Sequence, residues 1–155
     1  MKQKRVFLLC GAPGSGKSTW VKRQIETEGG IWCSRDNVRY SLLKDTDSYF
    51  AKEDEVFTTW INNIQQALND NIENVYVDAT HLNEVSRNKT LSQLNIPNDY
   101  NLIAVCFRPS LSVCLERNAK REGRERVPDH VVRGMYNRYT EPYSIDFKEV
   151  WLYNG

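Results

Sequence analysis

The chain has 155 residues, of which 40% are apolar and 26% are charged; this is typical of a soluble globular domain and excludes a chain that is disordered throughout. Twenty-one basic and twenty acidic side chains give a net charge of +1, whereas a protein that coats DNA would be more basic. Its apolar runs are far shorter than the roughly 20 residues that span a bilayer, so we expect no membrane segment.

Short apolar runs, which are typical of buried strands, alternate along the sequence with segments of helical periodicity. In chain order the predicted elements are a strand at 5–10, a helix at 17–28, a strand at 31–33, a helix at 36–43, a helix at 54–71, a strand at 75–77, a helix at 83–94, a strand at 102–107, helices at 110–121 and 129–139, and a strand at 150–152. The helix at 54–71 has the clearest pattern, because its apolar side chains from Val56 to Leu68 fall on one stripe.

This alternation predicts an α/β domain with a central parallel sheet of about five strands flanked by helices. No internal repeat, low-complexity tract or linker divides residues 1–155, so we expect a single domain. In such sheets ligands bind outside the carboxyl ends of the strands. The polar clusters described below follow predicted strands, which places them at that edge.

The cysteines, histidines and tryptophans often carry function, but here we assign none of them a catalytic or ligand-binding role. The cysteines form no Cys-x-x-Cys pair and have no histidine at metal-ligand spacing, so we expect buried free thiols and neither a zinc site nor a disulfide scaffold. His81 and His130 stand alone in polar surroundings and receive neither a ligand nor a base role. Trp20 and Trp60 lie on core-facing helix stripes, which favours packing over base stacking. The cysteines are Cys10, Cys33, Cys106 and Cys114.

Nothing in the sequence points to a membrane or to an obligate protein partner. The apolar run from Val6 to Cys10 is too short for the core of a signal peptide, and Gly11 interrupts it. We therefore expect a cytoplasmic protein.

A phosphate-binding loop is the strongest motif. Residues 11–18, Gly-Ala-Pro-Gly-Ser-Gly-Lys-Ser, match the P-loop pattern G-x-x-x-x-G-K-[ST], with a strand before it and a helix after it. Glycines let the backbone wrap N–H donors around phosphate oxygens, and the start of the helix adds its positive dipole end. We predict ATP binding, with Lys17 at the β- and γ-phosphates and the Ser18 hydroxyl on Mg²⁺. The predicted ATP contacts are Gly11, Ala12, Pro13, Gly14, Ser15, Gly16, Lys17, Ser18, Thr19 and, from a later segment, Arg117.

Among P-loop proteins, the length and the motifs favour a small kinase. A GTPase would carry an Asn-Lys-x-Asp sequence that reads guanine, and this chain has none. Asp36 follows the second strand, where its carboxylate would face the γ-phosphate and accept the proton of an attacking hydroxyl. Alternatively, Asp36 caps the next helix. Arg39, one turn further on, would bind an anionic part of the acceptor or remain a solvated helix charge.

Asp78 ends the third strand, as does the acid that orients Mg²⁺ and its waters in P-loop proteins. Thr80 and Asn83 follow in the next loop, near the place of an acceptor. The competing interpretation is a turn in which Asp78 and Thr80 bond their own backbone.

A strongly basic stretch lies at residues 117–126, where five of ten side chains are cationic and two are acidic. A solvated helix end would explain it. In a P-loop kinase it would instead form a basic helical lid, at about 117–128, whose arginines neutralise charge that develops on the transferred group. Gly123 supplies a hinge, and the sequence leaves open whether Arg121, Arg124 or Arg126 contacts phosphate.

Taken together, the chain resembles the 5′-kinase domain of the phage polynucleotide kinase family, within the small P-loop kinases. Four blocks carry the resemblance, in the family's order: 11–20, Ser-Arg-Asp-Asn-Val-Arg at 34–39, Asp-Ala-Thr-His-Leu-Asn at 78–83, and 117–136. The first block is shared with many kinases, whereas the Arg-Asp-x-x-Arg block and the lid block are more specific. The acid at Asp78 and an inserted residue in the lid depart from the family's pattern.

The resemblance implies a role for individual residues. Asp36 would deprotonate a 5′-hydroxyl, Arg39 would contact the adjacent phosphate of the acceptor, and Arg121 would contact the transferred phosphoryl group. Thr80 would lie beside the acceptor. The implied cofactors are ATP and Mg²⁺, and the implied partner is the 5′ end of DNA or RNA. No phosphatase domain follows residue 155, so no 3′-phosphatase activity is expected.

Two other functions stay open. The nearer one keeps the kinase chemistry but uses a hydroxyl of a small metabolite, sugar nucleotide or antibiotic; affinity for a neutral acceptor would depend little on salt, unlike affinity for a strand gripped through several phosphates. The alternative of a different class is an ATP-gated binding module without transfer activity.

Overall fold

The computed structural model describes residues 3–143 and 146–154, and within these ranges it contains one sheet of five parallel strands in the order β2-β3-β1-β4-β5. The strands are β1 (Lys4–Cys10), β2 (Ile31–Ser34), β3 (Asn74–Asp78), β4 (Tyr100–Phe107) and β5 (Glu149–Tyr153). The expectation about a segment after residue 155 lies outside the described residues.

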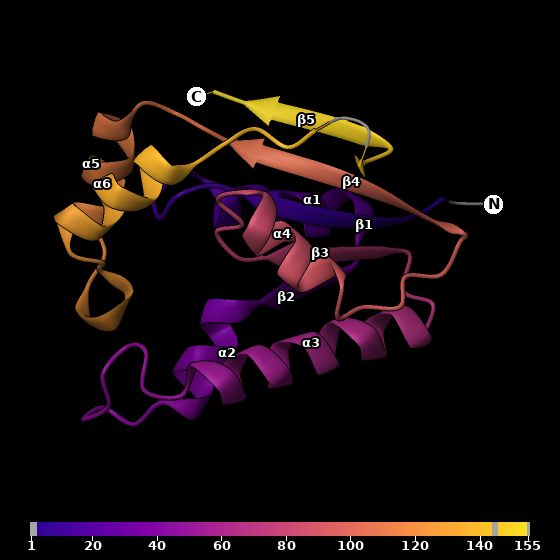
Figure 1. Ribbon diagram of the computed structural model, residues 1–155, viewed down its shortest axis with the longest axis horizontal. Coiled ribbons are helices and arrows are strands. Elements are labelled where there is room, and N and C mark those ends of the chain that lie inside the picture. The colour runs from indigo at the N-terminus through magenta and orange to yellow at the C-terminus, as the bar shows by residue number, and fades with distance from the viewer. Residues whose placement is uncertain (1–2, 144–145, 155) are drawn as a thin grey trace.

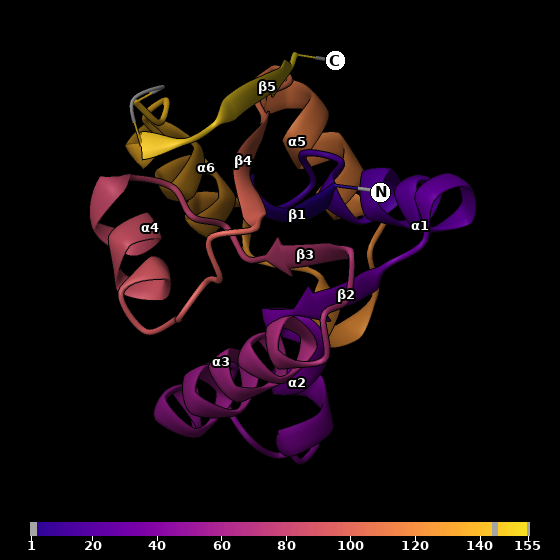
Figure 2. The same ribbon diagram turned by 90° about the vertical axis from the view of Figure 1, so that its right-hand side faces the viewer.

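Helices cover both faces of this sheet (Figure 2). On one face α1 packs Trp20 and Val21 against Phe7, and on the other face α3 packs Trp60 and Ile64 against the strands. The helices are α1 (Lys17–Glu28), α2 (Arg35–Leu42), α3 (Glu53–Asn69), α4 (Glu84–Leu91), α5 (Leu111–Ala119) and α6 (Asp129–Arg138), with a short 3₁₀ turn η1 (Gly123–Glu125). The predicted α/β class and the parallel five-stranded sheet are confirmed.

Five of the six helices in the described residues end one to three residues earlier than the sequence predicts, and α4 and α5 are two of them. The helix expected at 83–94 ends at Leu91, and the one expected at 110–121 ends at Ala119. In both cases the chain continues as a tight turn, in which the N–H groups of Gln93 and Leu94, and of Lys120 and Arg121, bond the carbonyl three residues back instead of four. The second of these turns, at residues 120–121, lies within the predicted lid at 117–128.

The expected buried side chains are largely confirmed, with one correction. Trp20 and Trp60 lie in the core, and all four cysteines are buried free thiols. His81, in contrast, is not in polar surroundings: its side chain is buried and lies against the Trp60 ring. Among the described residues, no helix is both long and apolar enough to cross a bilayer.

The parallel arrangement gathers the functional segments at one edge. The P-loop follows β1, α2 follows β2 directly, and Asp78 is the last residue of β3. Figure 1 shows the tips of β4 and β5 directed toward the side on which α5, α6 and the segment between α2 and α3 lie. A site built from these segments therefore lies beyond the carboxyl ends of the strands, as expected for an open α/β sheet.

Candidate active site

The loop between β1 and α1 has the backbone of a phosphate cradle. Gly14 and Gly16 adopt positive φ values of 79° and 105°. Gly16 is also the N-cap of α1 and no side chain caps that end, so the first N–H groups of the helix stay available to an anion. A methyl group at Gly14 would lie 2.4 Å from the carbonyl oxygen of Cys114, because the loop packs directly on α5.

The polar atoms of this cradle lack anionic partners. Lys17 Nζ donates to the carbonyl oxygens of Gly11 and Ala12, at 2.7 and 3.3 Å, and the buried Ser15 hydroxyl has no hydrogen-bond partner among the described residues. Burial lowers the pKa of Lys17, and the carboxylates of Asp78 and Asp36 oppose that shift. The ammonium and the buried hydroxyl would both be satisfied by the oxygens of a bound phosphate.

Asp78 is held beside the cradle by the neighbouring strand. Its side chain is buried, and its Oδ2 accepts a hydrogen bond of 2.9 Å from the indole nitrogen of Trp32. Burial raises the pKa of Asp78, while the charge of Lys17 and the bond from Trp32 lower it. This carboxylate is thus bonded across to β2, and the Thr80 carbonyl oxygen accepts from the backbone N–H of Gly11, which ties the two loops together.

Asp36 lies in the first turn of α2 without capping that helix. The cap is Ser34, whose hydroxyl oxygen accepts from the backbone N–H of Asn37 at 3.2 Å, so the capping interpretation of Asp36 is wrong. The Asp36 side chain is about half exposed, and its Oδ1 accepts from Tyr49, at 2.7 Å, and from Arg39. Both contacts use the same oxygen, which leaves Oδ2 available to receive a proton.

Arg39 is a buried brace for this carboxylate. Its Nε and Nη2 donate to Glu53 Oε1 at 2.8 and 2.7 Å, and its Nη1 donates to Asp36 and to the Tyr49 hydroxyl. Its guanidinium also stacks on the Tyr49 ring, 4.2 Å from the centroid. Only 4% of Arg39 is exposed, so the interpretation as a solvated helix charge is wrong. Arg35 adds a second ion pair to Glu53, at 3.1 Å.

The basic stretch forms a loop that is closed at its base by Asn118. This buried amide donates to the carbonyl of Val127 at 2.6 Å and accepts from its backbone N–H at 3.0 Å. Between these points, Arg124 lies over the Tyr40 ring, 5.7 Å from its centroid, and 3.8 Å from the Asp45 carboxylate. The lid therefore touches α2 and the residues that follow it. Arg117 lies at the other end of the lid, where Nη1 donates to the Gly14 carbonyl at 3.4 Å.

These parts enclose one cavity of about 900 Å³. The P-loop forms one wall, α2 and residues 47–53 form another, and the lid with α6 forms a third. The predicted residues that line this cavity are Pro13, Gly14, Ser15, Gly16, Lys17, Ser18, Asp36, Arg39, Asp78, Thr80, Arg121, Arg124 and Arg126. The structure thus gathers most of the predicted site in a single space, including all three lid arginines.

Five predicted residues lie outside the lining of this cavity. Gly11 and Ala12 are buried at the base of the loop, and Thr19 is exposed on α1. Asn83 caps α4, where its side-chain oxygen accepts from the backbone N–H of Ser86, so its side chain is used within the fold. Arg117 contacts the P-loop as described above.

The sequence did not single out several residues that shape the cavity. Tyr49, Phe50 and Glu53 reach it because residues 43–52 fold back over α2, and Trp32 does so from β2. Two adjacent aromatic residues in a polar connection were the available signal for Tyr49 and Phe50. Glu53 and Trp32 carry no motif that would reveal their partners.

The donor atoms at this site suit Mg²⁺. No cluster of three His, Cys, Asp or Glu side chains that would cage a metal exists among the described residues. Mg²⁺ does not need one, because it keeps several waters and binds through one or two protein oxygens together with phosphate. Ser18 offers a hydroxyl and Asp78 a carboxylate in the same cavity. When bound there, Mg²⁺ would neutralise charge on the phosphates.

A family comparison agrees with this geometry. Residues 6–142 match the AAA_33 family, which is described as an AAA domain. The chain belongs to the AAA_33 family. Since the match runs from within β1 through α6, it includes the P-loop, Asp36, Asp78 and the lid.

Solved structures with the same fold include a chain of an RNA repair complex and two kinases. A chain of the Pnkp1/Rnl/Hen1 RNA repair complex matches with a TM-score of 0.74 and 20% identity, over 89% of this chain and 44% of that one. A gluconokinase from Sinorhizobium meliloti 1021 matches with a TM-score of 0.63 and 19% identity, over 98% and 83%. A sugar kinase from Janibacter sp. HTCC2649 matches with 0.65 and 15%, over 96% and 85%.

These likenesses show the fold, which is that of P-loop kinases. The chain spans less than half the length of the matched chain in the RNA repair complex, but most of the length of the two small-molecule kinases.

Proposed function

We propose that this protein is an ATP-dependent kinase that transfers the γ-phosphate to the 5′-hydroxyl end of DNA or RNA. One observation carries the proposal: the P-loop and the Asp36 carboxylate line the same cavity, with one Asp36 oxygen held by Tyr49 and Arg39 and the other unengaged by them. A phosphate donor on the loop and a base for an acceptor hydroxyl are the two requirements of a kinase.

In the proposed reaction each of these residues has a distinct role. The acceptor hydroxyl oxygen attacks the γ-phosphorus, the bond from that phosphorus to the β–γ bridging oxygen breaks, and ADP leaves. The hydroxyl proton passes to Asp36 Oδ2. Lys17 holds the β- and γ-phosphates, and Arg121 faces the same space and would offset charge on the transferred group. Bound Mg²⁺ would offset further charge on the phosphates.

Three observations support a nucleic-acid end as the acceptor. The blocks at 34–39 and 117–136 resemble those of polynucleotide 5′-kinases, and the chain shares its fold with part of a chain in an RNA repair complex. Arg124 and Arg126 line the cavity from exposed positions on the lid, where they would meet the phosphates that follow the first nucleotide. The guanidinium of Arg39 already donates to Glu53, Asp36 and Tyr49. We therefore assign Arg39 the role of positioning Asp36, in preference to a direct contact with the acceptor.

A small-molecule hydroxyl is the second candidate acceptor. Its support is the overlap with the gluconokinase, which extends over 83% of that enzyme against 44% of the chain in the RNA repair complex. Both candidates use the same donor site and the same base.

The deciding experiment measures transfer of labelled γ-phosphate from ATP to a 5′-hydroxyl oligonucleotide and, in parallel, to gluconate and other sugars. We expect labelled oligonucleotide from the wild type and a loss of about 10²–10⁴-fold in Asp36→Asn. Asp54→Asn, an exposed carboxylate on α3, is the matched control and should keep full activity. Labelled sugar without labelled oligonucleotide would overturn the acceptor assignment. Equal transfer activity of Asp36→Asn and Asp54→Asn would overturn the assignment of Asp36 as the general base.

A further inference from the structure

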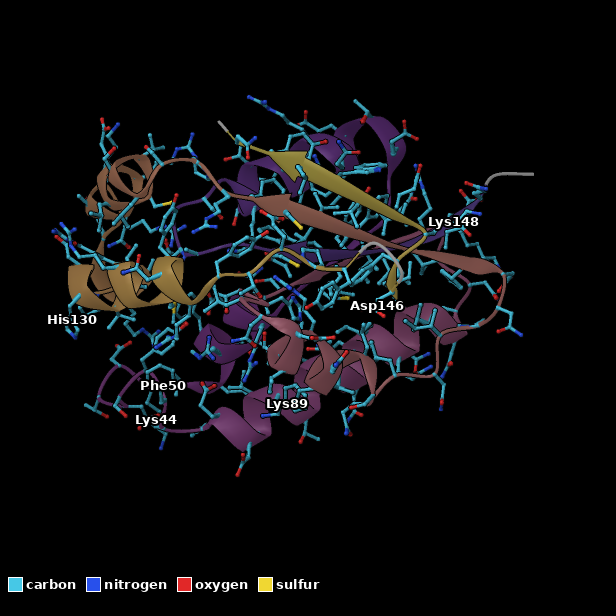
Figure 3. The ribbon with its side chains drawn as sticks, turned by 45° about the horizontal axis from the view of Figure 1, so that its top comes forward. Lys44, Phe50, Lys89, His130, Asp146 and Lys148 are labelled. Carbon is cyan, nitrogen blue, oxygen red and sulfur yellow. The ribbon has the colours of Figure 1, made fainter. Side chains whose placement is uncertain are left out.

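An exposed aromatic ring stands in the wall of the cavity. Phe50 is 62% exposed and belongs to the segment between α2 and α3. Figure 3 shows Phe50 with Lys44 on this segment, on the same side of the molecule as His130 at the start of α6. A large apolar side chain left in water beside a polar cavity is a feature that binding would explain, since burial of its ring would be favourable.

The position of this ring is fixed relative to Asp36. Phe50 packs edge-to-face on Tyr49, with ring centroids 4.7 Å apart and an interplanar angle of 82°. Tyr49 in turn donates to Asp36 Oδ1 at 2.7 Å and lies under the Arg39 guanidinium. Burial and the charge of Asp36 raise the pKa of Tyr49, which keeps its hydroxyl protonated as a donor. Phe50 is therefore one tyrosine ring away from the base of the reaction.

We propose that Phe50 is the stacking platform for the 5′-terminal base of the acceptor strand. The proposal rests on the function proposed above, and it identifies the 5′-terminal base as the part of the substrate that this wall of the cavity binds. In a nucleoside, one sugar separates the 5′-hydroxyl from the base, so a hydroxyl at Asp36 carries a base toward Phe50. Stacking is tolerant of sequence, because every base has a π-face. An aliphatic sugar acid offers no such face.

Fluorescence of a 5′-terminal 2-aminopurine tests this contact directly, because stacking quenches it. The oligonucleotide carries a 5′-hydroxyl and is mixed with enzyme in the presence of ADP. We expect quenching with the wild type, loss of quenching with Phe50→Ala, and restored quenching with Phe50→Trp. Tyr143→Ala is the matched control, because Tyr143 has the same 62% exposure and does not line the cavity.

Transfer kinetics give the second readout. Phe50→Ala should raise KM for the oligonucleotide roughly 5- to 150-fold, the range for loss of one base–aromatic stack, with kcat changed less than twofold. An oligonucleotide whose 5′-terminal nucleotide is abasic should show the same raised KM with the wild type and no further rise with Phe50→Ala. The KM for ATP should be unchanged, whereas stacking of the donor's adenine on Phe50 would raise it.

The outcomes separate the two proposals. Transfer to oligonucleotides with unchanged KM and quenching in Phe50→Ala, or an equal KM increase for normal and abasic ends, overturns the platform and leaves the kinase assignment intact. A rise in the KM for ATP alone overturns it as well. Absence of both transfer and quenching in the wild type overturns both proposals together.

Discussion

Under the proposed function the cavity has a donor wall and an acceptor wall, and the two are built by different means. The donor wall is backbone: residues 11–15 are buried, two glycines take left-handed conformations, and the loop is clamped between β1 and α5. The acceptor wall is made of side chains, in which Asp36, Arg39, Tyr49 and Glu53 hold one another through hydrogen bonds and ion pairs. Phe50 in this wall and the arginines of the adjacent lid are exposed or only partly buried.

The difference distinguishes phosphate binding, which all P-loop proteins share, from recognition of the second substrate, which differs from one protein to another. A cradle of N–H groups binds phosphate through its shape, so its sequence tolerates little change. A wall of side chains on connecting segments can change its substrate by substitution without disturbing the sheet. We therefore expect mutations in the donor wall to act on stability and ATP binding, and mutations in the acceptor wall to act mainly on transfer.

The strongest test of the donor wall is Gly14→Ala. The new methyl group would lie 2.4 Å from the Cys114 carbonyl oxygen, at a φ of 79° that disfavours any side chain. We expect a loss of about 2–5 kcal/mol in the free energy of unfolding, from strain and overpacking together, and a loss of ATP binding.

The control for this change is Gly29→Ala. Gly29 has a similar φ of 70° but nothing within 4 Å of the added methyl group, so it carries the strain without the clash. Urea unfolding and ATP titration of both variants separate the effect of backbone strain from the effect of the clash with Cys114. Equal losses in the two variants would mean that the loop shifts freely away from α5.

The acceptor wall is best tested at Glu53. Glu53→Gln keeps the shape but removes the charge that Arg39 and Arg35 share. Because Arg39 is buried and Glu53 is 28% exposed, we expect a loss of about 1–3 kcal/mol, below the range for fully buried pairs. With Arg39 released, Asp36 loses its fixed position, and kcat should fall more than about tenfold while the Kd for ATP stays the same.

Glu55→Gln, an exposed carboxylate in the first turn of the same helix, controls for the loss of negative charge at the start of α3. If Glu55→Gln lowers kcat as much as Glu53→Gln does, the brace on Asp36 contributes nothing specific to transfer.

The donor wall could be predicted from the sequence and the acceptor wall only in part, for a physical reason. Strand runs, helix starts and the P-loop depend on local pattern, so the elements and the place of Asp36 follow from neighbouring residues. The brace on Asp36 depends on Glu53 and Tyr49, which meet Arg39 only when residues 43–52 fold back. His81 was misplaced because its polar neighbours hide a contact between its ring and Leu9 of β1, 72 residues away.

His81 gives a pH test of the fold behind the donor wall. Its Nδ1 donates to the Leu9 carbonyl oxygen at 2.7 Å, and its Nε2 lies 2.9 Å from the Thr90 hydroxyl oxygen. Burial lowers the pKa of His81 to about 3. Below pH 6.5 the unfolded chain therefore binds a proton that the folded chain does not, and stability falls by about 1.4 kcal/mol per pH unit toward pH 3.

Urea unfolding between pH 7 and pH 4.5 measures this slope. His81→Gln removes the titrating group and should flatten the curve relative to the wild type, although it lowers stability at pH 7. His130→Gln, at an exposed position on α6, should leave the slope unchanged. A wild-type slope equal to that of His81→Gln would show that His81 takes up a proton in the folded protein.

The smallest effect is expected where the lid meets the acceptor wall. Arg124 lies 3.8 Å from Asp45 and 5.7 Å from the Tyr40 ring centroid, and the Tyr40 hydroxyl donates to the Arg124 carbonyl at 3.5 Å. Asp45 is fully exposed, so water and salt screen its ion pair, and Asp45→Asn should not change transfer. Arg124→Ala also removes the cation–π contact, which at an exposed site corresponds to about a two- to fivefold rise in KM for the acceptor.

Salt then separates the two uses of Arg124. If the Arg124 charge also contacts a phosphate of the acceptor, Arg124→Ala should reduce the slope of log KM for the acceptor against log salt by about one phosphate contact. If Arg124 only contacts Tyr40, that slope should be unchanged. Arg133→Ala, an exposed arginine on α6 that does not line the cavity, controls for the loss of one positive charge. A large fall in kcat with Arg124→Ala at unchanged KM would instead move the proposed role of the transition-state arginine from Arg121 to Arg124, because losing an interaction made only in the transition state lowers kcat without raising KM.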